Sequence, residues 1–431
     1  MSKLIIRGGR PITGTHHVFG NKNAALPMLA ATLLTSEPVT LENVPNIVDV
    51  QMMIEGLRAL GAKVVSEPEQ HRVTVEARNL RVDATVPAGI CTCIRTSFLF
   101  AAPMLARKGV IRLKGAPGGD SIGRRRLDTH INGFAALGVR STFRKTGGCT
   151  LSVKGGLKGA YFMLDEASVM ATENLVMAAV CAEGTTTLYN TACEPHIRNL
   201  CRMLCSMGAK IEGIGTNRLV IEGVKKLSGG TFRVEGDIIE AASYLVASIV
   251  THGALVLEGI ELEDLAVLEP AFHKFGVRWT IEGTTLRLSA KQRLCTAYDL
   301  GAAIPKVEDG PWPMLPSDLL SALIVLATQT RGTELFFEKM FESRLYFVDH
   351  LIGMGAKIVQ CDPHRAVITG PTMLQGSVVS SPDIRAGMAL IIAALCAKGV
   401  TIIHNAESVD RGYEAIEENL RALGAEIRRE N

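Results

Sequence analysis

The sequence has few aromatic residues, little net charge and no long apolar run. Phe, Trp and Tyr make up 5% of the 431 residues although 47% are hydrophobic, so we expect aliphatic cores of helices packed on sheets. No apolar stretch reaches the ~18 residues of a membrane span, and the start, Met-Ser-Lys-Leu-Ile-Ile-Arg, lacks the apolar run of a signal peptide. The net charge of +3 comes without a Lys/Arg run interleaved with aromatic residues, which argues against a nucleic-acid or membrane surface. We therefore expect a cytoplasmic protein that has neither nucleic acid nor a membrane as a partner.

The ten cysteines support neither a zinc site nor a disulfide framework. They lie in mostly apolar settings, and none belongs to a Cys-x-x-Cys pair with a second set of ligands. The tightest pair, Cys91-Thr-Cys93, is expected to be two buried and reduced thiols.

An internal repeat is the strongest feature that the chain does have. Six times a helix-like stretch ends in a block of the type Leu-Gly-Ala-Lys followed by a strand, about seventy residues apart. The glycines at these six ends are Gly61, Gly138, Gly208, Gly276, Gly355 and Gly424. About forty residues before each glycine lies an apolar helix rich in small residues, as at 23–34 and 386–396. Such regular spacing indicates internal duplication.

The first copy shows what one unit contains. An apolar helix over 22–35 is followed by a strand over 38–42 and by an amphipathic helix over 50–60, whose apolar residues recur at helical spacing. Gly61 provides the left-handed stop of that helix, and the alternating pattern over 62–76 predicts a hairpin. We expect six units of the form helix–strand–helix–hairpin.

The two chain ends are expected to complete one domain together. The sixth copy ends with a single strand over 425–430, and Lys3–Arg7 is a strand with no helix before it. The chain is also too long for one ordinary core. We predict a contiguous domain over about 21–234 and a second domain over 1–20 and 235–431, with three units in each. A ligand is expected in the cleft between two such domains.

The repeats differ in the charged residues at the starts of their expected helices. The cations at these places are Lys22, Arg95, Arg125, Arg344, Arg385 and Arg411. A cation at a helix N-terminus costs ~0.3–1 kcal/mol, so this placement is poor for stability but suits the binding of an anion. In the alternative interpretation, acids that precede the cations at positions 342, 383 and 410 neutralise them locally. Gly118 and Gly119 before Asp120 predict either a mobile lid or a plain turn.

Several motifs taken together resemble those of the enolpyruvyl transferases, over essentially the whole chain. They are Gly20-Asn-Lys-Asn-Ala-Ala-Leu26, Pro117-Gly-Gly-Asp-Ser-Ile-Gly-Arg-Arg125, Ala171-Thr-Glu-Asn174, Pro316-Ser-Asp318, Phe341-Glu-Ser-Arg344, Asp383-Ile-Arg385 and Asp410-Arg-Gly-Tyr413. Within the family they are most similar to the branch that acts on a UDP-sugar. The resemblance implies an α/β fold of two inside-out α/β barrel domains, each made of three repeats, which agrees with the six repeats counted above.

The resemblance also implies an activity, which is transfer of enolpyruvate from phosphoenolpyruvate to the 3-hydroxyl of UDP-N-acetylglucosamine. Phosphate leaves through a tetrahedral intermediate, and the reaction is the first committed step of peptidoglycan precursor synthesis. The implied catalytic residues are Lys22, Asp120, Asp318 and Arg411, with Asp318 as the general base and Asp120 as the general acid. The implied phosphoenolpyruvate-binding residues are Lys22, Arg125, Arg344, Arg385 and Arg411. The implied UDP-sugar-binding residues are Asn23, Arg95, Arg125, Asp128, His130, Ser168, Val169, Asp318 and Met340. We expect no metal and no cofactor, and a monomer.

The sequence departs from the family pattern at four places. Asp120 stands where many members carry the cysteine that the epoxide antibiotic fosfomycin alkylates, so insensitivity to fosfomycin is expected. Met170 replaces a usual glycine, where it either closes the approach of the backbone to a phosphate or packs outward. Ile238 and Thr129 replace the usual Arg and Leu. Two other hypotheses therefore stay open: a paralogue whose acceptor is shikimate 3-phosphate or another nucleotide, and a non-catalytic repeat scaffold that binds an acidic partner.

Overall fold

The computed structural model describes residues 2–120, 122–123, 125–145 and 147–430, and it divides into two compact units. Unit 1 comprises Met1–Phe19, Asp120–Arg124 and Gly236–Asn431, and unit 2 comprises Gly20–Gly119 and Arg125–Glu235. Ser121 and Arg124, which belong to the motif over 117–125, lie outside the described residues. Within the described part of the chain, no helix combines the length and the apolar character that crossing a membrane requires.

Unit 2 is built on buried helices. They are α1 (Lys22–Ala31) with η1 (Thr32–Leu34), η3 (Arg95–Phe100) with α4 (Ala101–Lys108), and α6 (Val169–Ala179). The other described helices are α2 (Val48–Ala59), η2 (Pro68–Gln70), α3 (Ala88–Cys93), α5 (Asp128–Ala136) and α7 (Pro195–Ser206). α1 packs against η3 and α7, and α4 packs against α6. Almost every residue of α1 is buried, which suits a helix that is apolar on all sides.

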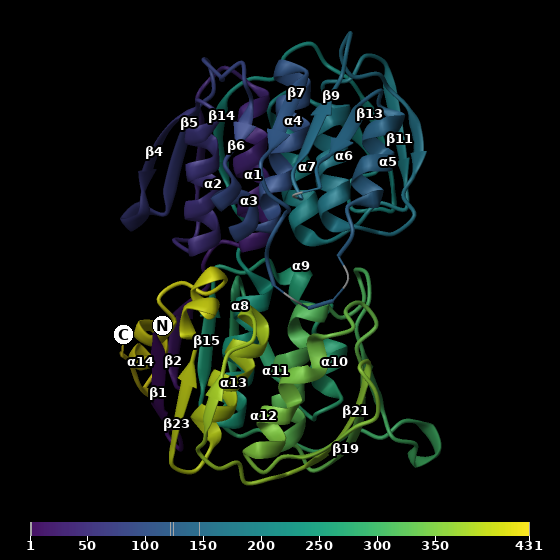
Figure 1. The fold of residues 1–431 in the computed structure, drawn as a ribbon. Coiled ribbons are helices and arrows are strands. Elements are labelled where there is room, and N and C mark those ends of the chain that lie inside the picture. The colour runs from purple at the N-terminus through teal and green to yellow at the C-terminus, as the bar shows by residue number, and fades with distance from the viewer. Residues whose placement is uncertain (1, 121, 124, 146, 431) are drawn as a thin grey trace. The chain divides into compact units, whose positions relative to one another are not determined.

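Three four-stranded sheets belong to unit 2, and strands lie to either side of its helices (Figure 1). The first sheet has the order β14 (Gly230–Arg233), β3 (Val39–Glu42), β5 (Arg72–Glu76), β4 (Lys63–Glu67). The second has the order β6 (Thr85–Val86), β7 (Val110–Leu113), β9 (Cys149–Ser152), β8 (Arg140–Phe143). The third has the order β10 (Tyr161–Met163), β11 (Thr185–Tyr189), β13 (Arg218–Glu222), β12 (Lys210–Glu212). In each sheet the first two strands are parallel and the other pairs are antiparallel.

Unit 1 has three long buried helices that pack against one another. They are α8 (Ile238–Val250), α11 (Ser317–Gln329) and α13 (Ile384–Cys396). Its other described helices are α9 (Leu262–Leu265), α10 (Glu269–His273), η4 (Leu300–Ala302), η5 (Arg344–Phe347), α12 (Val348–Gly353), η6 (Ala406–Arg411) and α14 (Ile416–Ala422). All of α8 and all but the last residue of α13 are buried. These helices therefore form the centre of the unit rather than a surface layer.

The sheets of unit 1 have the same arrangement, with one parallel pair at an edge, although this pair comes last in the order of the first sheet. The first is β16 (Trp279–Glu282), β17 (Thr285–Leu288), β15 (Leu255–Glu258), β2 (Gly14–His17). The second is β18 (Lys306–Glu308), β19 (Gly332–Phe337), β21 (Arg365–Gly370), β20 (Lys357–Gln360). The third is β22 (Val378–Ser380), β23 (Val400–His404), β1 (Lys3–Arg7), β24 (Glu426–Glu430). Since β1 is antiparallel to both β23 and β24, the N-terminal strand joins a sheet otherwise built by the end of the chain.

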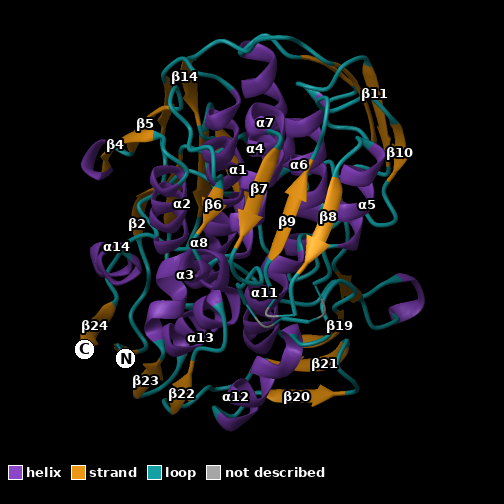
Figure 2. Ribbon diagram, turned by 45° about the horizontal axis from the view of Figure 1, so that its top comes forward, coloured by secondary structure: helices purple, strands orange, loops and turns teal. Residues whose placement is uncertain are grey.

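The predicted fold class is confirmed, since each unit has helices inside and sheets outside, and three repeats (Figures 1 and 2). The six glycines that follow the second helix of each copy all have positive φ, from 76° to 105°, a conformation that glycine adopts without strain. The expected unit lacked one strand. Each sheet is completed by a further strand, which runs parallel to the strand that follows the buried helix. These strands have only two to four residues, too few to show the alternation that identifies a strand. Two of these strands pair with a strand far away in the sequence: β2 pairs with β15, and β14 pairs with β3.

Candidate functional site

In unit 1, the carboxylate of Asp318 lies between two buried arginines. Asp318 is the second residue of α11, Arg344 opens η5, and Arg385 is the second residue of α13. Nη2 of Arg344 donates to Oδ1 of Asp318 at 2.9 Å, and Nε of Arg385 donates to Oδ2 at 2.9 Å. The arginine side chains are 3% and 6% exposed, whereas Asp318 is 28% exposed. One carboxylate thus orients two cations and still has an exposed surface.

The surroundings of Arg385 keep its side chain charged. Burial alone would lower the pKa of Arg385, but the Asp318 carboxylate raises it above its usual value. The guanidinium carbon lies 5.3 Å from the ring centre of Tyr413. Asp383, the acid that precedes Arg385, caps α13 by accepting from the backbone N of Arg385 at 2.8 Å and of Ala386 at 2.9 Å. This acid therefore satisfies the start of the helix, while Asp318 meets the guanidinium.

Asp120 and Arg411 form a salt bridge within unit 1, with side chains that are 18% and 19% exposed. The expectation that Arg411 opens a helix is wrong, because it is the last residue of η6 and α14 begins only at Ile416. Asp410, which precedes Arg411, pairs with Arg429 through two bonds of 2.7 and 2.8 Å. Here too the candidate cation is paired with an acid far away in the sequence.

The two glycines before Asp120 are explained by the turn that they form. A Cβ atom at Gly118 would lie 1.8 Å from the carbonyl oxygen of Thr92, and Gly119 has a φ of +98°. The N–H of Gly118 donates to the carbonyl of Cys91 at 2.8 Å. Glycine is therefore required at 118 by close packing and favoured at 119 by backbone conformation. A lid that closes on a substrate stays a prediction.

In unit 2, Lys22 and Asp49 form a buried ion pair. Nζ of Lys22 lies 2.8 Å from Oδ2 of Asp49, and the side chains are 10% and 4% exposed. Lys22 is the first residue of α1, and the cap of that helix is Asn21, which accepts from the backbone N of Asn23 at 2.7 Å. A buried lysine requires such a partner. The pair joins the start of α1 to the start of α2 and leaves Asn23, half-buried, beside it.

A group of arginines lies elsewhere in unit 2, around the start of η3 and the segment before α5. Nη2 of Arg95 donates to the backbone carbonyls of Arg125 and Arg126, the latter at 3.0 Å. Burial, and then the cation of Arg125, lower the pKa of Arg95 to about 10. Arg126 forms two bonds of 2.5 Å with Asp128, the first residue of α5. Two guanidinium groups that repel each other favour an anion beside them.

His130 is a core residue in this structure. Its side chain is 2% exposed, Nδ1 lies 3.2 Å from Nδ2 of Asn174, and its ring meets that of Phe98 edge-on at 5.1 Å. Burial, and then the cation of Arg95, lower the pKa of His130 to about 3. The imidazole is therefore neutral at neutral pH.

The other residues assigned to the UDP-sugar lie at element ends. Ser168 caps α6, and its carbonyl accepts from the N–H of Thr172 at 2.9 Å. Val169 follows it in the same helix and packs on the core of unit 2. Met340 belongs to unit 1, lies in the segment between β19 and η5, and is 41% exposed. The structure thus places Met340 with Asp318 in one unit and the remaining assigned residues in the other.

Met170, Thr129 and Ile238, three of the four departures from the family pattern, make contacts within the protein. Met170 is partly buried and packs against the core of unit 2. The hydroxyl of Thr129 donates to Asp165 at 2.5 Å, and Ile238 begins α8 with 4% exposure. Of the two interpretations of Met170, these contacts support the one in which the side chain packs against the protein, rather than the one in which it closes the approach of the backbone to a phosphate.

Sequence reasoning missed Glu338, the residue after β19. Its side chain is fully buried and touches both Ser317 and Arg344. A glutamate directly after the apolar run Leu335-Phe336-Phe337 could have identified it, because a buried carboxylate must find partners.

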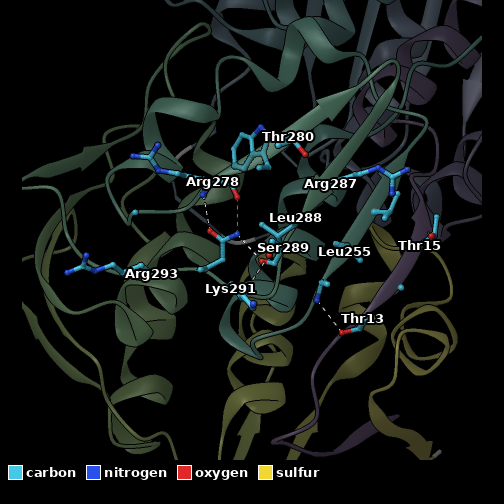
Figure 3. A pocket seen from close by; sticks show the side chains of 16 residues that line it. Thr13, Thr15, Leu255, Arg278, Thr280, Arg287, Leu288, Ser289, Lys291 and Arg293 are labelled. Atoms are coloured by element: carbon cyan, nitrogen blue, oxygen red, sulfur yellow. Dashed lines mark hydrogen bonds between the residues drawn. The ribbon is translucent and has the colours of Figure 1, made fainter.

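A hollow of ≈ 730 Å³ in unit 1 lies apart from all these residues. It is lined by parts of β2, β15, β16, β17 and the loop after β17, and none of the assigned residues lines it. Figure 3 shows Arg287 extending to the opposite side from Arg278 and Arg293, so these cations do not converge on one ligand. Among the residues that the structure describes, no group of three or more His, Cys, Asp or Glu side chains could hold a metal ion.

Known proteins resemble this chain over nearly its whole length. The family model of EPSP synthase (3-phosphoshikimate 1-carboxyvinyltransferase) matches residues 6–420. A Treponema denticola protein named UDP-N-acetylglucosamine 1-carboxyvinyltransferase is 49% identical over 427 residues, or 99% of each chain. A Bradyrhizobium diazoefficiens protein of the same name is 47% identical and covers 99% of this chain and 98% of its own.

Solved structures support the same fold. The enolpyruvyl transferase NikO from Streptomyces tendae superposes with a TM-score of 0.88 at 24% identity, covering 99% of this chain and 98% of its own. EPSP synthase from Acinetobacter baumannii has a TM-score of 0.77 at 18% identity, with 100% of both chains covered. On the matched family model and the full-length identity to its relatives, this chain is an enzyme of the EPSP synthase (3-phosphoshikimate 1-carboxyvinyltransferase) family of enolpyruvyl transferases.

Proposed function

We propose that this protein transfers enolpyruvate from phosphoenolpyruvate to the 3-hydroxyl of UDP-N-acetylglucosamine and releases phosphate. The observation that carries the proposal is the carboxylate of Asp318 held by the buried Arg344 and Arg385, in a chain 49% identical to a relative with that activity in its name. The reaction would be the first committed step of peptidoglycan precursor synthesis.

Phosphoenolpyruvate is an anion with two groups that need different partners. Its carboxylate would bind Arg344 and Arg385, whose planar guanidinium groups can each offer two N–H donors. Its phosphate would bind the cations Lys22, Arg125 and Arg411. Because Asp318 hydrogen-bonds to both arginines and orients them, their geometry is prepared before the substrate arrives. Such preparation lowers the ordering cost of binding.

The chemistry would be an addition followed by an elimination. The oxygen of the sugar 3-hydroxyl would form a bond to C2 while Asp318 accepts the hydroxyl proton, and Asp120 would donate a proton to C3. In the second half, the bond from C2 to the phosphate oxygen breaks and C3 returns a proton to the Asp120 carboxylate, which restores the double bond, while the proton on Asp318 would leave with the released phosphate. The salt bridge between Asp120 and Arg411 fits this role, since a phosphate that pairs with Arg411 would release Asp120 to take up a proton.

The acceptor would be bound mainly by residues of unit 2. Arg95 and Arg125, two cations close to each other, would meet the diphosphate, and Asn23 would meet the sugar. Asp128, Ser168, Val169 and Met340 would complete the site, and His130 would act from the core through its neighbours. We further propose that the protein acts as a monomer in the cytoplasm and without a metal or cofactor.

Phosphate release tests the proposal. The protein is mixed with phosphoenolpyruvate and, separately, with UDP-N-acetylglucosamine, shikimate 3-phosphate or uridine monophosphate. We expect turnover with the UDP-sugar alone. Turnover only with another acceptor would assign the protein to a paralogous reaction, and absence of turnover with all three would favour a non-catalytic anion-binding scaffold.

A further inference from the structure

Glu338 uses both of its carboxylate oxygens beneath the Asp318–Arg344 pair. Oε1 accepts from the backbone N of Met340 at 2.9 Å and of Phe341 at 3.0 Å, and the hydroxyl of Ser317 lies 2.8 Å from Oε2. Oε2 also lies 3.7 Å from Nε of Arg344. The side chain is 0% exposed, so no water molecule can substitute for a lost contact from the surface.

These contacts join two segments that carry candidate site residues. Ser317 opens α11 and directly precedes Asp318. Met340 and Phe341 belong to the segment between β19 and η5, which delivers Arg344. The distance of 2.9 Å between Asp318 and Arg344 therefore depends on two backbone segments that meet at one carboxylate.

A second buried acid supports the same place. Asp309 is also 0% exposed, and its Oδ1 accepts from the backbone N of Lys339 at 2.6 Å. Burial, and then the neighbouring Asp309 carboxyl, raise the pKa of Glu338. Asp309 and Glu338 together hold the turn that follows β19 by its backbone N–H groups, which fixes the turn independently of its exposed side chains.

We infer that Glu338, which none of the assignments above includes, is a positioning residue that sets Asp318 and Arg344 at the spacing the substrate carboxylate requires. The inference rests on the proposed function, because it assigns that carboxylate to Arg344. Glu338 itself does not touch the reacting atoms, and it acts through Ser317 and the backbone of Met340 and Phe341.

The test compares two buried glutamates, Glu334 within β19 and Glu338 directly after it. Glu338→Ala removes every side-chain contact of Glu338 described above. Glu338→Gln keeps an oxygen acceptor for the backbone N–H groups of Met340 and Phe341. Glu334, within β19, is also 0% exposed and accepts from Thr296, so Glu334→Ala is the matched control. Glu338→Ala loses several buried hydrogen bonds that hold the segment before Arg344, which is proposed to bind the substrate carboxylate. This loss should raise the KM for phosphoenolpyruvate by about tenfold or more. We expect that rise in Glu338→Ala, recovery to within about threefold in Glu338→Gln, and an unchanged KM in Glu334→Ala.

A purely structural role would lower the stability of both alanine variants and leave both KM values alone, which would overturn the inference. If Glu338→Ala does not fold, Ser317→Ala carries the test, since it removes only the hydroxyl that ties α11 to Glu338. An unchanged KM in Ser317→Ala would then contradict the inference.

Amide hydrogen exchange separates the inference from the proposed function. Exchange over residues 338–347 is measured without substrate, and we expect it to be faster in Glu338→Ala than in Glu334→Ala. If the wild-type protein releases no phosphate with any acceptor, the proposed function fails, and calorimetric binding of phosphoenolpyruvate replaces the KM. Equal exchange in the two variants, or equal phosphoenolpyruvate affinity in Glu338→Ala and the wild type, would overturn the positioning role.

Discussion

Replacing Asp318 by asparagine separates its chemical role from its electrostatic role. The change keeps the size of the side chain but removes the charge that meets Arg344 and Arg385. As the general base, Asp318 should contribute about 10²–10⁴ to the rate. We therefore expect kcat to fall by that factor, or about 3–5 kcal/mol in the activation free energy.

The same substitution leaves two buried cations without their shared anion. Removing one partner of a buried ion pair typically costs about 3–5 kcal/mol. Asp318 is 28% exposed, however, and Glu338 still lies 3.7 Å from Nε of Arg344. We expect the free energy of unfolding to fall by about 2–3 kcal/mol. Asp318→Asn loses the orientation that the carboxylate gives to the arginines, but the carboxylate of phosphoenolpyruvate supplies a new anion to both of them. Because the second effect offsets the first, the Kd for phosphoenolpyruvate should not rise.

Single-turnover phosphate release, calorimetric binding of phosphoenolpyruvate and urea unfolding measure these three quantities. The matched control is Asp362→Asn, which removes the acid of an exposed Asp–Arg pair with Arg365 and should change neither kcat nor the Kd. A kcat of Asp318→Asn within about tenfold of the wild type would contradict the general-base role. Loss of phosphoenolpyruvate binding would refute the reasoning that the substrate carboxylate offsets the loss of Asp318 as the partner of the arginines.

Three further predictions concern single residues. The wild-type protein should form no adduct with fosfomycin, whereas Asp120→Cys should be inactivated with time and gain the mass of the antibiotic; an adduct on the wild-type protein would contradict this. The pKa of His130 is lowered to about 3 from ~6.5, so between these pH values the unfolded state binds more protons than the folded state. The free energy of unfolding should therefore fall as the pH falls through this range, by up to about 1.4 kcal/mol per pH unit. Urea unfolding at several pH values should show a smaller slope in His130→Gln, and an equal slope would argue against a neutral buried imidazole. Met170→Gly should lower the free energy of unfolding by about 1–2 kcal/mol and leave the KM for the UDP-sugar unchanged; a much lower KM would show that Met170 obstructs the phosphate.

Much of the fold could be predicted because its strongest signals are local. A helix such as α8 is apolar at nearly every position, and glycines such as Gly61 end the second helix of each copy in the left-handed conformation. The strands that complete each sheet escaped prediction since β6, for example, has only two residues. Their pairing depends on the parallel neighbour rather than on their own composition.

The site could be predicted in its residue types but not in its pairings. Cations at unusual places identified Arg344, Arg385 and Arg411 from the sequence, yet their partners lie 26, 67 and 291 residues away. The fold brings these pairs together, whereas two of the acids next to the cations in the sequence bind elsewhere: Asp383 caps α13 and Asp410 pairs with Arg429. Glu338 shows the opposite case, where a local signal existed and went unused.

The central claim is that the enolpyruvyl group moves to the sugar 3-oxygen, and the structure of the product tests it most directly. The protein is incubated with UDP-N-acetylglucosamine and phosphoenolpyruvate labelled with ¹³C at C2, and the product is examined by NMR. Our account predicts the label in an enol ether at the 3-oxygen, with two vinyl protons and one released phosphate per product. Label recovered only as pyruvate, or attached to another acceptor position, would contradict it.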